Sequence, residues 1–173
     1  MAGAARRSGH YLVGMAKPPH ARLPLLGVLL LLTYGAHIAE EYWGGEGFAA
    51  WAERTAGVHL TVDTWFSLNL VFFSAMAVGV LAGWFREPAR WLLIPFGAAV
   101  LVNGLLHLAA SLATRSYSPG LATGLLLWVP LGVTIIRSAR SRWAPAQIRA
   151  GIGVGVLLHV GVTLAAYSSS LPR

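Results

Sequence analysis

Three side chains that can bind a metal ion or move a proton lie within five consecutive residues, at the end of a long apolar segment. They are His37, Glu40 and Glu41 of the motif His-Ile-Ala-Glu-Glu. A charged side chain costs roughly 2.5 to 3.5 kcal/mol at the centre of a membrane helix, so an ionisable residue in such a segment is a candidate functional residue. Their spacing of three and four residues allows all three to project from one face of a helix.

A second polar pair, Asn103 and His107, lies four residues apart in another apolar segment. If the two segments are neighbouring helices, this pair can face the first motif, and imidazole and carboxylate groups then converge without any sulfur ligand. Such a set suits Zn, Fe or Mn better than Mg, which prefers oxygen ligands. We therefore predict a divalent metal ion bound by His37, Glu41 and His107.

The other two polar residues have predicted roles beside this ion. Glu40 is expected to act as a general acid or base, and Asn103 to orient a ligand, a water molecule or a substrate oxygen. The ion would activate water for hydrolysis or oxygen for oxidation, and both reactions stay open at this point.

Two other functions would use the same residues. In an acid/base enzyme without a metal, repulsion between adjacent carboxylates keeps Glu40 or Glu41 protonated, and this acid protonates an alkene in an isomerisation or a terpene-type cyclisation. In a proton-linked transporter or channel, the same groups relay protons. Transport is the weaker alternative, because the apolar segments offer no continuous polar path across the bilayer.

The amino-acid composition is that of an integral membrane protein. Of the 173 residues, 56% are hydrophobic and 11% are charged, and the mean hydropathy is +0.63, whereas about 25% of the residues in a soluble domain are charged. Cysteine is absent, which excludes disulfides, thiolate ligands and a cysteine nucleophile. The net charge of +7 does not indicate nucleic-acid binding, because the arginines flank the apolar segments instead of forming a patch.

Five apolar runs of about 20 residues predict an all-α, polytopic bundle of five transmembrane helices. The runs cover residues 23–42, 62–85, 91–113, 120–137 and 149–168. They form one transmembrane domain at residues 23–168, between a basic cytoplasmic tail at residues 1–22 and a short tail at residues 169–173. The longest loop, from Gly44 to Thr61, is expected to contain a short amphipathic segment over the mouth of the bundle.

The positive charges predict the orientation of the bundle. Ten of the 13 Lys and Arg residues belong to the N-terminal tail and to the second and fourth connections, and three lie on the other side. The positive-inside rule then places the N-terminus in the cytoplasm and the C-terminus outside, in the inner (cytoplasmic) membrane of the cell.

The polar residues gather in the outer half of this predicted bundle. His37 and His107 lie at a common depth, about five and six residues below the outer ends of their helices, at about 1.5 Å per residue. Asn69, Tyr117 and His159 approach the same level from three other helices, and we predict that they contact the substrate. The expected substrate is a lipid-like or isoprenoid-like molecule that enters from the bilayer.

The motif at residues 37–41 resembles the one that names the HXXEE domain family of small bacterial integral membrane proteins. The segment from Asn103 to His107 (NGLLH) matches the asparagine and histidine that accompany the motif in that family, and the segment from Ser116 to Gly120 (SYSPG) resembles a third family feature. The resemblance covers the chain from about Leu23 to Tyr167. It implies a membrane enzyme and supports the residues chosen above, but it names no substrate.

Overall fold

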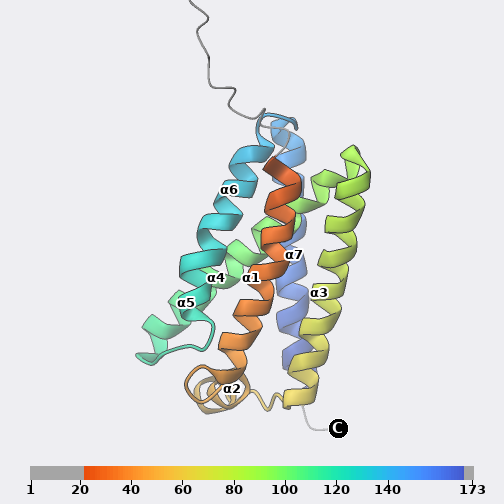
Figure 1. The fold of residues 1–173 in the computed structure, drawn as a ribbon. Coiled ribbons are helices and arrows are strands. Elements are labelled where there is room, and N and C mark those ends of the chain that lie inside the picture. The colour runs from red at the N-terminus through yellow and green to blue at the C-terminus, as the bar shows by residue number, and fades with distance from the viewer. Residues whose placement is uncertain (1–21, 170–173) are drawn as a thin grey trace, which may run out of the picture.

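The structure, a computed structural model, describes residues 22–169, so the two predicted tails lie outside the described residues except for Arg22 and Ser169. Five long helical crossings run in alternating directions, and a short helix, α2, lies across one end of them (Figure 1). Each crossing is long and apolar enough to span a membrane. The predicted all-α bundle with five transmembrane helices is thereby confirmed, and its orientation in the membrane stays a prediction.

Four of the crossings are nearly continuous helices that follow the apolar runs. Their bounds are Arg22–Trp43 for α1, Val62–Phe85 for α3, Leu93–Thr114 for α4 and Pro145–Ser169 for α7. A short 3-10 segment, η2 (Glu87–Leu92), precedes α4. The last helix begins at Pro145, earlier than the predicted residue 149, because proline is well tolerated in the first turn of a helix.

The remaining crossing consists of three joined pieces. Helix α5 (Leu121–Thr123) leads into a π-helical segment, η3 (Gly124–Trp128), which continues as α6 (Val129–Ala139). Pro130 lies in the first turn of α6, and its missing N–H group cannot take part in the regular hydrogen bonds of the preceding turn. Short π-helical segments inside α-helices are often found at functional sites.

Helix α2 (Phe48–Ala56) confirms the amphipathic segment predicted in the longest loop. Its Trp51 and Ala52 are buried, and Gly57 ends it in the left-handed conformation. Helix α2 lies at the end of the bundle where α1 ends and α3 begins (Figure 1). The polar end of the bundle is therefore covered by protein.

Helix α4 lies at the centre of the packing, between α6 and α7. Glycines allow the close contact with α7: a Cβ atom on Gly155 would lie 2.3 Å from the carbonyl oxygen of Pro95. The half of the bundle far from α2 is filled by fully buried apolar side chains such as Leu30, Met76 and Ile135. The many van der Waals contacts between these side chains hold the helices in place. The buried ionisable groups lie in the other half, near α2.

A close contact between two glycines connects α4 to the fourth crossing, which is the one formed by α5, η3 and α6. A Cβ atom on Gly104 would lie 2.6 Å from the carbonyl oxygen of Gly124, so only glycine allows these backbones to approach so closely. His107 follows Gly104 by three residues, and Thr123 directly precedes Gly124. This contact thus brings the polar residues of the two helices to one place.

Candidate metal centre

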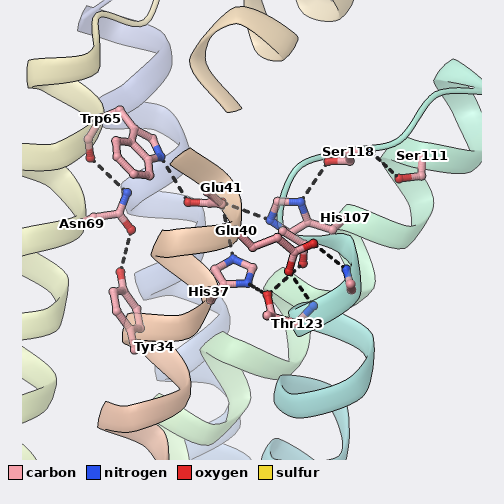
Figure 2. A network of polar contacts seen from close by, with 12 residues as sticks. Tyr34, His37, Glu40, Glu41, Trp65, Asn69, His107, Ser111, Ser118 and Thr123 are labelled. Atoms are coloured by element: carbon pink, nitrogen blue, oxygen red, sulfur yellow. Dashed lines mark hydrogen bonds and ion pairs between the residues drawn. The ribbon is translucent and has the colours of Figure 1, made fainter. Parts of the chain in front are cut away.

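Three side chains of metal-ligand type converge near the α2 end of the bundle. They are His37 and Glu41 from α1 and His107 from α4 (Figure 2). A ligand atom of each lies within 4.8 Å of those of the other two, and the residues are only 1% to 5% exposed. The structure therefore brings together the three residues that the sequence predicts as metal ligands.

The nitrogen–oxygen distances in this cluster fit the spacing of metal ligands. Glu41 Oε1 lies 3.4 Å from His37 Nε2 and 3.2 Å from His107 Nε2. A tetrahedral ion with bonds of about 2.0 to 2.1 Å separates neighbouring ligand atoms by roughly 3.3 to 3.4 Å. Two edges of such a tetrahedron are thus already present between these side chains.

The second nitrogen of each imidazole contacts a hydroxyl group. His37 Nδ1 lies 2.8 Å from Thr123 Oγ1, and His107 Nδ1 lies 2.9 Å from Ser118 Oγ. The Thr123 hydroxyl is also placed to donate to the Gly120 carbonyl, at 3.5 Å, which leaves its oxygen free to accept from His37. In metal sites the non-ligating nitrogen of a histidine usually donates such a hydrogen bond, which fixes the ring and its tautomer.

The tautomer of the two imidazoles decides what faces Glu41. If both Nδ1 atoms carry the proton, the Nε2 atoms of His37 and His107 present lone pairs to the Glu41 carboxylate, and three acceptors face one another. His37 Nε2 is buried without a hydrogen-bond partner; its 3.4 Å contact with Glu41 is within ion-pair range but lacks hydrogen-bond geometry. A buried carboxylate and two imidazole lone pairs repel each other unless a cation lies between them.

Aromatic side chains surround the cluster and fix its orientation. Trp65 Nε1 donates to Glu41 Oε2 at 3.1 Å, so Oε1 is the oxygen that faces both imidazoles. His37 stacks on Trp128 with ring centroids 3.6 Å apart, and Phe48 of α2 meets His107 edge-on at 5.8 Å. The walls of the cluster are therefore largely apolar, which strengthens electrostatic interactions inside it.

Glu40 is turned away from the cluster, although its spacing allowed it to join. Its Oε1 accepts hydrogen bonds from the Tyr117 hydroxyl and, at 2.8 Å, from the Ala122 N–H group, and its Oε2 accepts from the Thr123 N–H group at 2.6 Å. These N–H groups open α5, where an acceptor is needed. Glu40 thus anchors the fourth crossing to α1, and the acid/base role predicted for it stays a prediction without support from this geometry.

Tyr117 contributes to the same anchor by its hydrogen bond to Glu40, and it is 46% exposed. Partial burial and its hydrogen bond to Glu40 raise the pKa of Tyr117 to about 12, so the phenol is a donor at neutral pH. Tyr117 does not line the cavities described next. The substrate contact predicted for it is therefore not supported by its position.

Two adjoining cavities reach the cluster. The outer cavity, of about 320 Å³, lies between α2, α3, α4 and α7, and its wall includes Glu41 and His107. The inner cavity, of about 60 Å³, is lined by His37 and Trp128 among others. Asn69, Asn103 and His159 line both cavities, so three of the residues predicted to position a ligand or contact the substrate lie where a ligand can meet them.

Asn69 has a second role in holding the site together. Its oxygen accepts from the Tyr34 hydroxyl at 2.9 Å, and its amide nitrogen donates to the Trp65 carbonyl at 3.0 Å (Figure 2). Because Trp65 in turn donates to Glu41, this chain of contacts links α1 and α3 around the carboxylate. Both ends of the Asn69 side chain are thus already bonded within the protein.

Gly120 fits between the two imidazole rings. A Cβ atom there would lie 2.7 Å from His107 Cε1 and 2.8 Å from His37 Cε1, and the backbone has φ of +98°. Both facts require glycine at this position. The segment before α5 is therefore part of the cluster wall and sets the separation of the two rings.

Several residues of the site were missed by sequence reasoning. Thr123, Trp65 and Trp128 were not among the residues that the sequence predicted for the site. Ser118 and Gly120 had one signal, since both belong to the segment 116–120 that resembles a family feature. The roles of the others depend on which helices are neighbours, which composition and spacing do not define.

The fold and the site define a polytopic membrane protein with a buried His-Glu-His cluster at one end of its bundle. The chain belongs to the HXXEE family, since the model of that family, described as a protein of unknown function with HXXEE motif, matches residues 28–135. The chain is 39% identical over 110 residues to the uncharacterized protein YrkK of Bacillus subtilis (strain 168). That alignment covers 58% of this chain and 65% of the relative, just under two thirds of its length. No solved structure matches significantly.

Proposed function

We propose that the protein is an integral membrane enzyme with a divalent metal ion bound by His37, Glu41 and His107. One observation carries the proposal: three ligand atoms converge in a buried place while the outer nitrogen of each histidine is held by a hydroxyl group. Nitrogen and oxygen ligands without sulfur suit Zn, Fe or Mn. An ion held by these three residues would have fewer protein ligands than a closed structural zinc site, which would leave it able to bind water or substrate.

The chemistry of such an ion is the activation of water for hydrolysis or of oxygen for oxidation. The protein's residues would orient the reactants around it. Thr123 and Ser118 hold the imidazoles, Trp65 holds the carboxylate, and Asn103 and His159 face the cavities beside it. Apolar walls keep bulk water away, which strengthens the interactions that orient a polar reactant.

The outer cavity favours a lipid-like or isoprenoid-like substrate. Its lining is mostly apolar and aromatic, with Glu41, Asn103 and His107 at one end. Helix α7 packs along α4 and contacts α3 less extensively, so the seam between α3 and α7 is the natural entry from the bilayer. A polar group at the ion and an apolar chain along α7 would then fill the cavity together.

The metal-free and transport alternatives receive less support. Of the two acids that a metal-free enzyme could use, Glu40 fits poorly, because both of its oxygens accept hydrogen bonds from backbone N–H groups. A transport path would have to cross the buried apolar half around Leu30 and Met76. We place the α2 end at the outer face of the inner membrane, with the N-terminus in the cytoplasm, on the strength of the positive charges.

The test is metal analysis of the full-length protein purified in detergent, with and without reloading by Zn, Mn or Fe. We expect about one ion per chain, and loss of that ion in His37→Ala and His107→Ala. His59→Ala is the matched control, because His59 lies in the exposed loop before α3 and pairs with Glu53, far in the chain from the predicted ligands. Equal metal content in all four proteins, or no ion after reloading, would refute the proposed centre.

A second readout separates metal loss from misfolding. Bound ion stabilises the folded state by mass action, so chelator should lower the thermal midpoint of the wild type and of His59→Ala. The midpoints of His37→Ala and His107→Ala should not respond to chelator or metal. A variant that is folded and still stabilised by metal would contradict the assignment of its histidine as a ligand.

A further inference from the structure

The inner cavity contains an unusual concentration of unpaired polar atoms. Within residues 22–169, buried side-chain atoms without a hydrogen-bond partner are His37 Nε2, Asn103 Oδ1 and Trp128 Nε1. All three residues line this one cavity of about 60 Å³. An unpaired buried polar group costs about as much as a lost hydrogen bond, so three around one small space indicate that the space takes a polar group.

Two of these atoms, on Asn103 and Trp128, are left for such a group, because His37 Nε2 faces Glu41 in the proposed metal centre. The indole nitrogen of Trp128 can only donate, and the carboxamide oxygen of Asn103 can only accept. The rest of the lining is mainly apolar, with Phe72, Val100 and Val162 among its members. A group that satisfies this cavity must therefore accept from one wall and donate to the other.

We propose that the inner cavity is a binding site for a hydroxyl group, from water or from an alcohol, beside His37. A hydroxyl is the smallest group that both donates and accepts a hydrogen bond. A water-sized group needs roughly 10 to 15 Å³ of such space, so a few oxygen-sized groups fit and a sugar or a phosphate does not. Trp128 donates to this hydroxyl, and the hydroxyl donates to Asn103.

Other small polar groups fit less well. A carbonyl or ether oxygen leaves Asn103 without a donor, and an ammonium group leaves Trp128 without an acceptor. A carboxylate would place a second negative charge next to Glu41, which is 5% exposed. The donor and acceptor on the walls therefore select a neutral hydroxyl.

This inference deepens the proposed function, because the hydroxyl would be the oxygen presented next to the metal ion. Binding of the hydroxyl itself needs only Trp128 and Asn103. The test can therefore be run in chelator, and its failure would be distinguishable from a failure of the metal centre.

The probes are 1-octanol and its isomer heptyl methyl ether, which have the same atoms but differ in the ability to donate. The readout is the indole N–H resonance of Trp128 in protein labelled at its seven tryptophans, in detergent and chelator, assigned by its loss in Trp128→Phe. We expect 1-octanol to shift this resonance saturably and about tenfold more tightly than the ether, the effect of one hydrogen bond.

Asn103→Leu removes the acceptor while keeping a similar volume. It should abolish the preference for the alcohol and leave metal content unchanged in reloaded protein. Thr163→Val is the matched control, because Thr163 lines only the outer cavity and its hydroxyl donates to the His159 carbonyl of its own helix. This control should keep the full preference for 1-octanol.

The outcomes identify the source of the hydroxyl. Preference for 1-octanol assigns the cavity to an alcohol. Equal response to both probes, combined with a dipolar contact between the Trp128 N–H and a bound water, assigns it to water. Absence of both signals in the wild type overturns the inference, whatever the metal analysis gives.

Discussion

Two adjacent carboxylates at the end of α1 lie in opposite environments. Glu41 is 5% exposed and faces two imidazole rings and an indole N–H. Glu40 instead faces the start of α5 and accepts hydrogen bonds from two of its backbone N–H groups. The first environment suits the binding of a cation, and the second suits a structural anchor. The comparison teaches that the two glutamates of the motif differ in role: Glu41 belongs to the His-Glu-His cluster, and Glu40 holds the start of α5 against α1.

The largest expected effect comes from neutralising each carboxylate in turn. Glu41→Gln should lower metal affinity by at least about 100-fold, because an anionic ligand is removed from the ion. Glu40→Gln should lower it by less than about tenfold, since the backbone contacts of residue 40 are changed and no ligand is lost. Competition with a chromophoric chelator measures both. Equal losses would show that the two carboxylates are not divided in this way.

Gly120→Ala should have the next largest effect, because the added Cβ atom would collide with both imidazoles. We expect metal affinity to fall by about 10- to 100-fold, the range of changes that displace metal ligands. Gly161→Ala is the control, since a Cβ atom there meets nothing within 4 Å. Titration of both variants with the same chelator is the measurement, and a wild-type affinity in Gly120→Ala would contradict the placement of the two rings.

Thr123 connects the two environments, because its hydroxyl contacts His37 and its N–H group donates to Glu40. Thr123→Val removes the hydroxyl and keeps the backbone contact, so it should weaken metal binding by about tenfold. It should also lower the thermal midpoint of the metal-free protein modestly, because the buried His37 Nδ1 loses its hydrogen-bond partner. Thr134→Val, which alters a hydroxyl bonded within α6, should change neither property. A lower thermal midpoint of Thr123→Val with unchanged metal affinity would show that Thr123 supports only the contact between Glu40 and α5.

The smallest effect should come from the anchor's exposed end. Tyr117→Phe removes one hydrogen bond to Glu40, which we expect to cost about 0.5 to 1 kcal/mol, because the residue is partly solvated. Burial and this bond raise the pKa of Tyr117 from 10 to about 12. The contribution is therefore fully present below about pH 10 and is lost as the pH rises through about 12.

The measurement is the difference in thermal midpoint between wild type and Tyr117→Phe across that range. The difference should be constant at neutral and mildly alkaline pH and should shrink above about pH 10, where the unfolded phenol ionises first. A difference that grows with alkalinity would reverse the sign of the linkage and contradict the donor role of the phenol.

Much of the fold and the convergence of His37, Glu41 and His107 were predictable, because both follow from local spacing and helix geometry. The run lengths determine the crossings, and His37 and Glu41 share a face because they are four residues apart. Depth counting placed His107 at the level of His37, and its Nε2 indeed lies 3.2 Å from Glu41. These predictions needed only the helix geometry and the thickness of a bilayer.

The rest depended on contacts between distant segments. Glu40 and Glu41 both satisfied the spacing rule, and only the position of α5 decides which of them turns away from the imidazoles. Trp128, which stacks on His37, is the last residue of the π-helical segment η3, and no local sequence pattern predicts that segment. Thr123 and Ser118 are of common residue types. Their hydroxyl groups reach the imidazoles because the close contact of Gly104 with Gly124 brings α4 and the fourth crossing together.

The contacts of Glu40 also have a consequence for when the site can form during synthesis. Its backbone partners lie 82 and 83 residues later in the chain, and synthesis proceeds from the N-terminus. When α1 enters the membrane, its carboxylates have neither the imidazole of His107 nor the start of α5 beside them. We therefore expect the site to be completed late in biogenesis, once the segment that begins with α5 has been inserted.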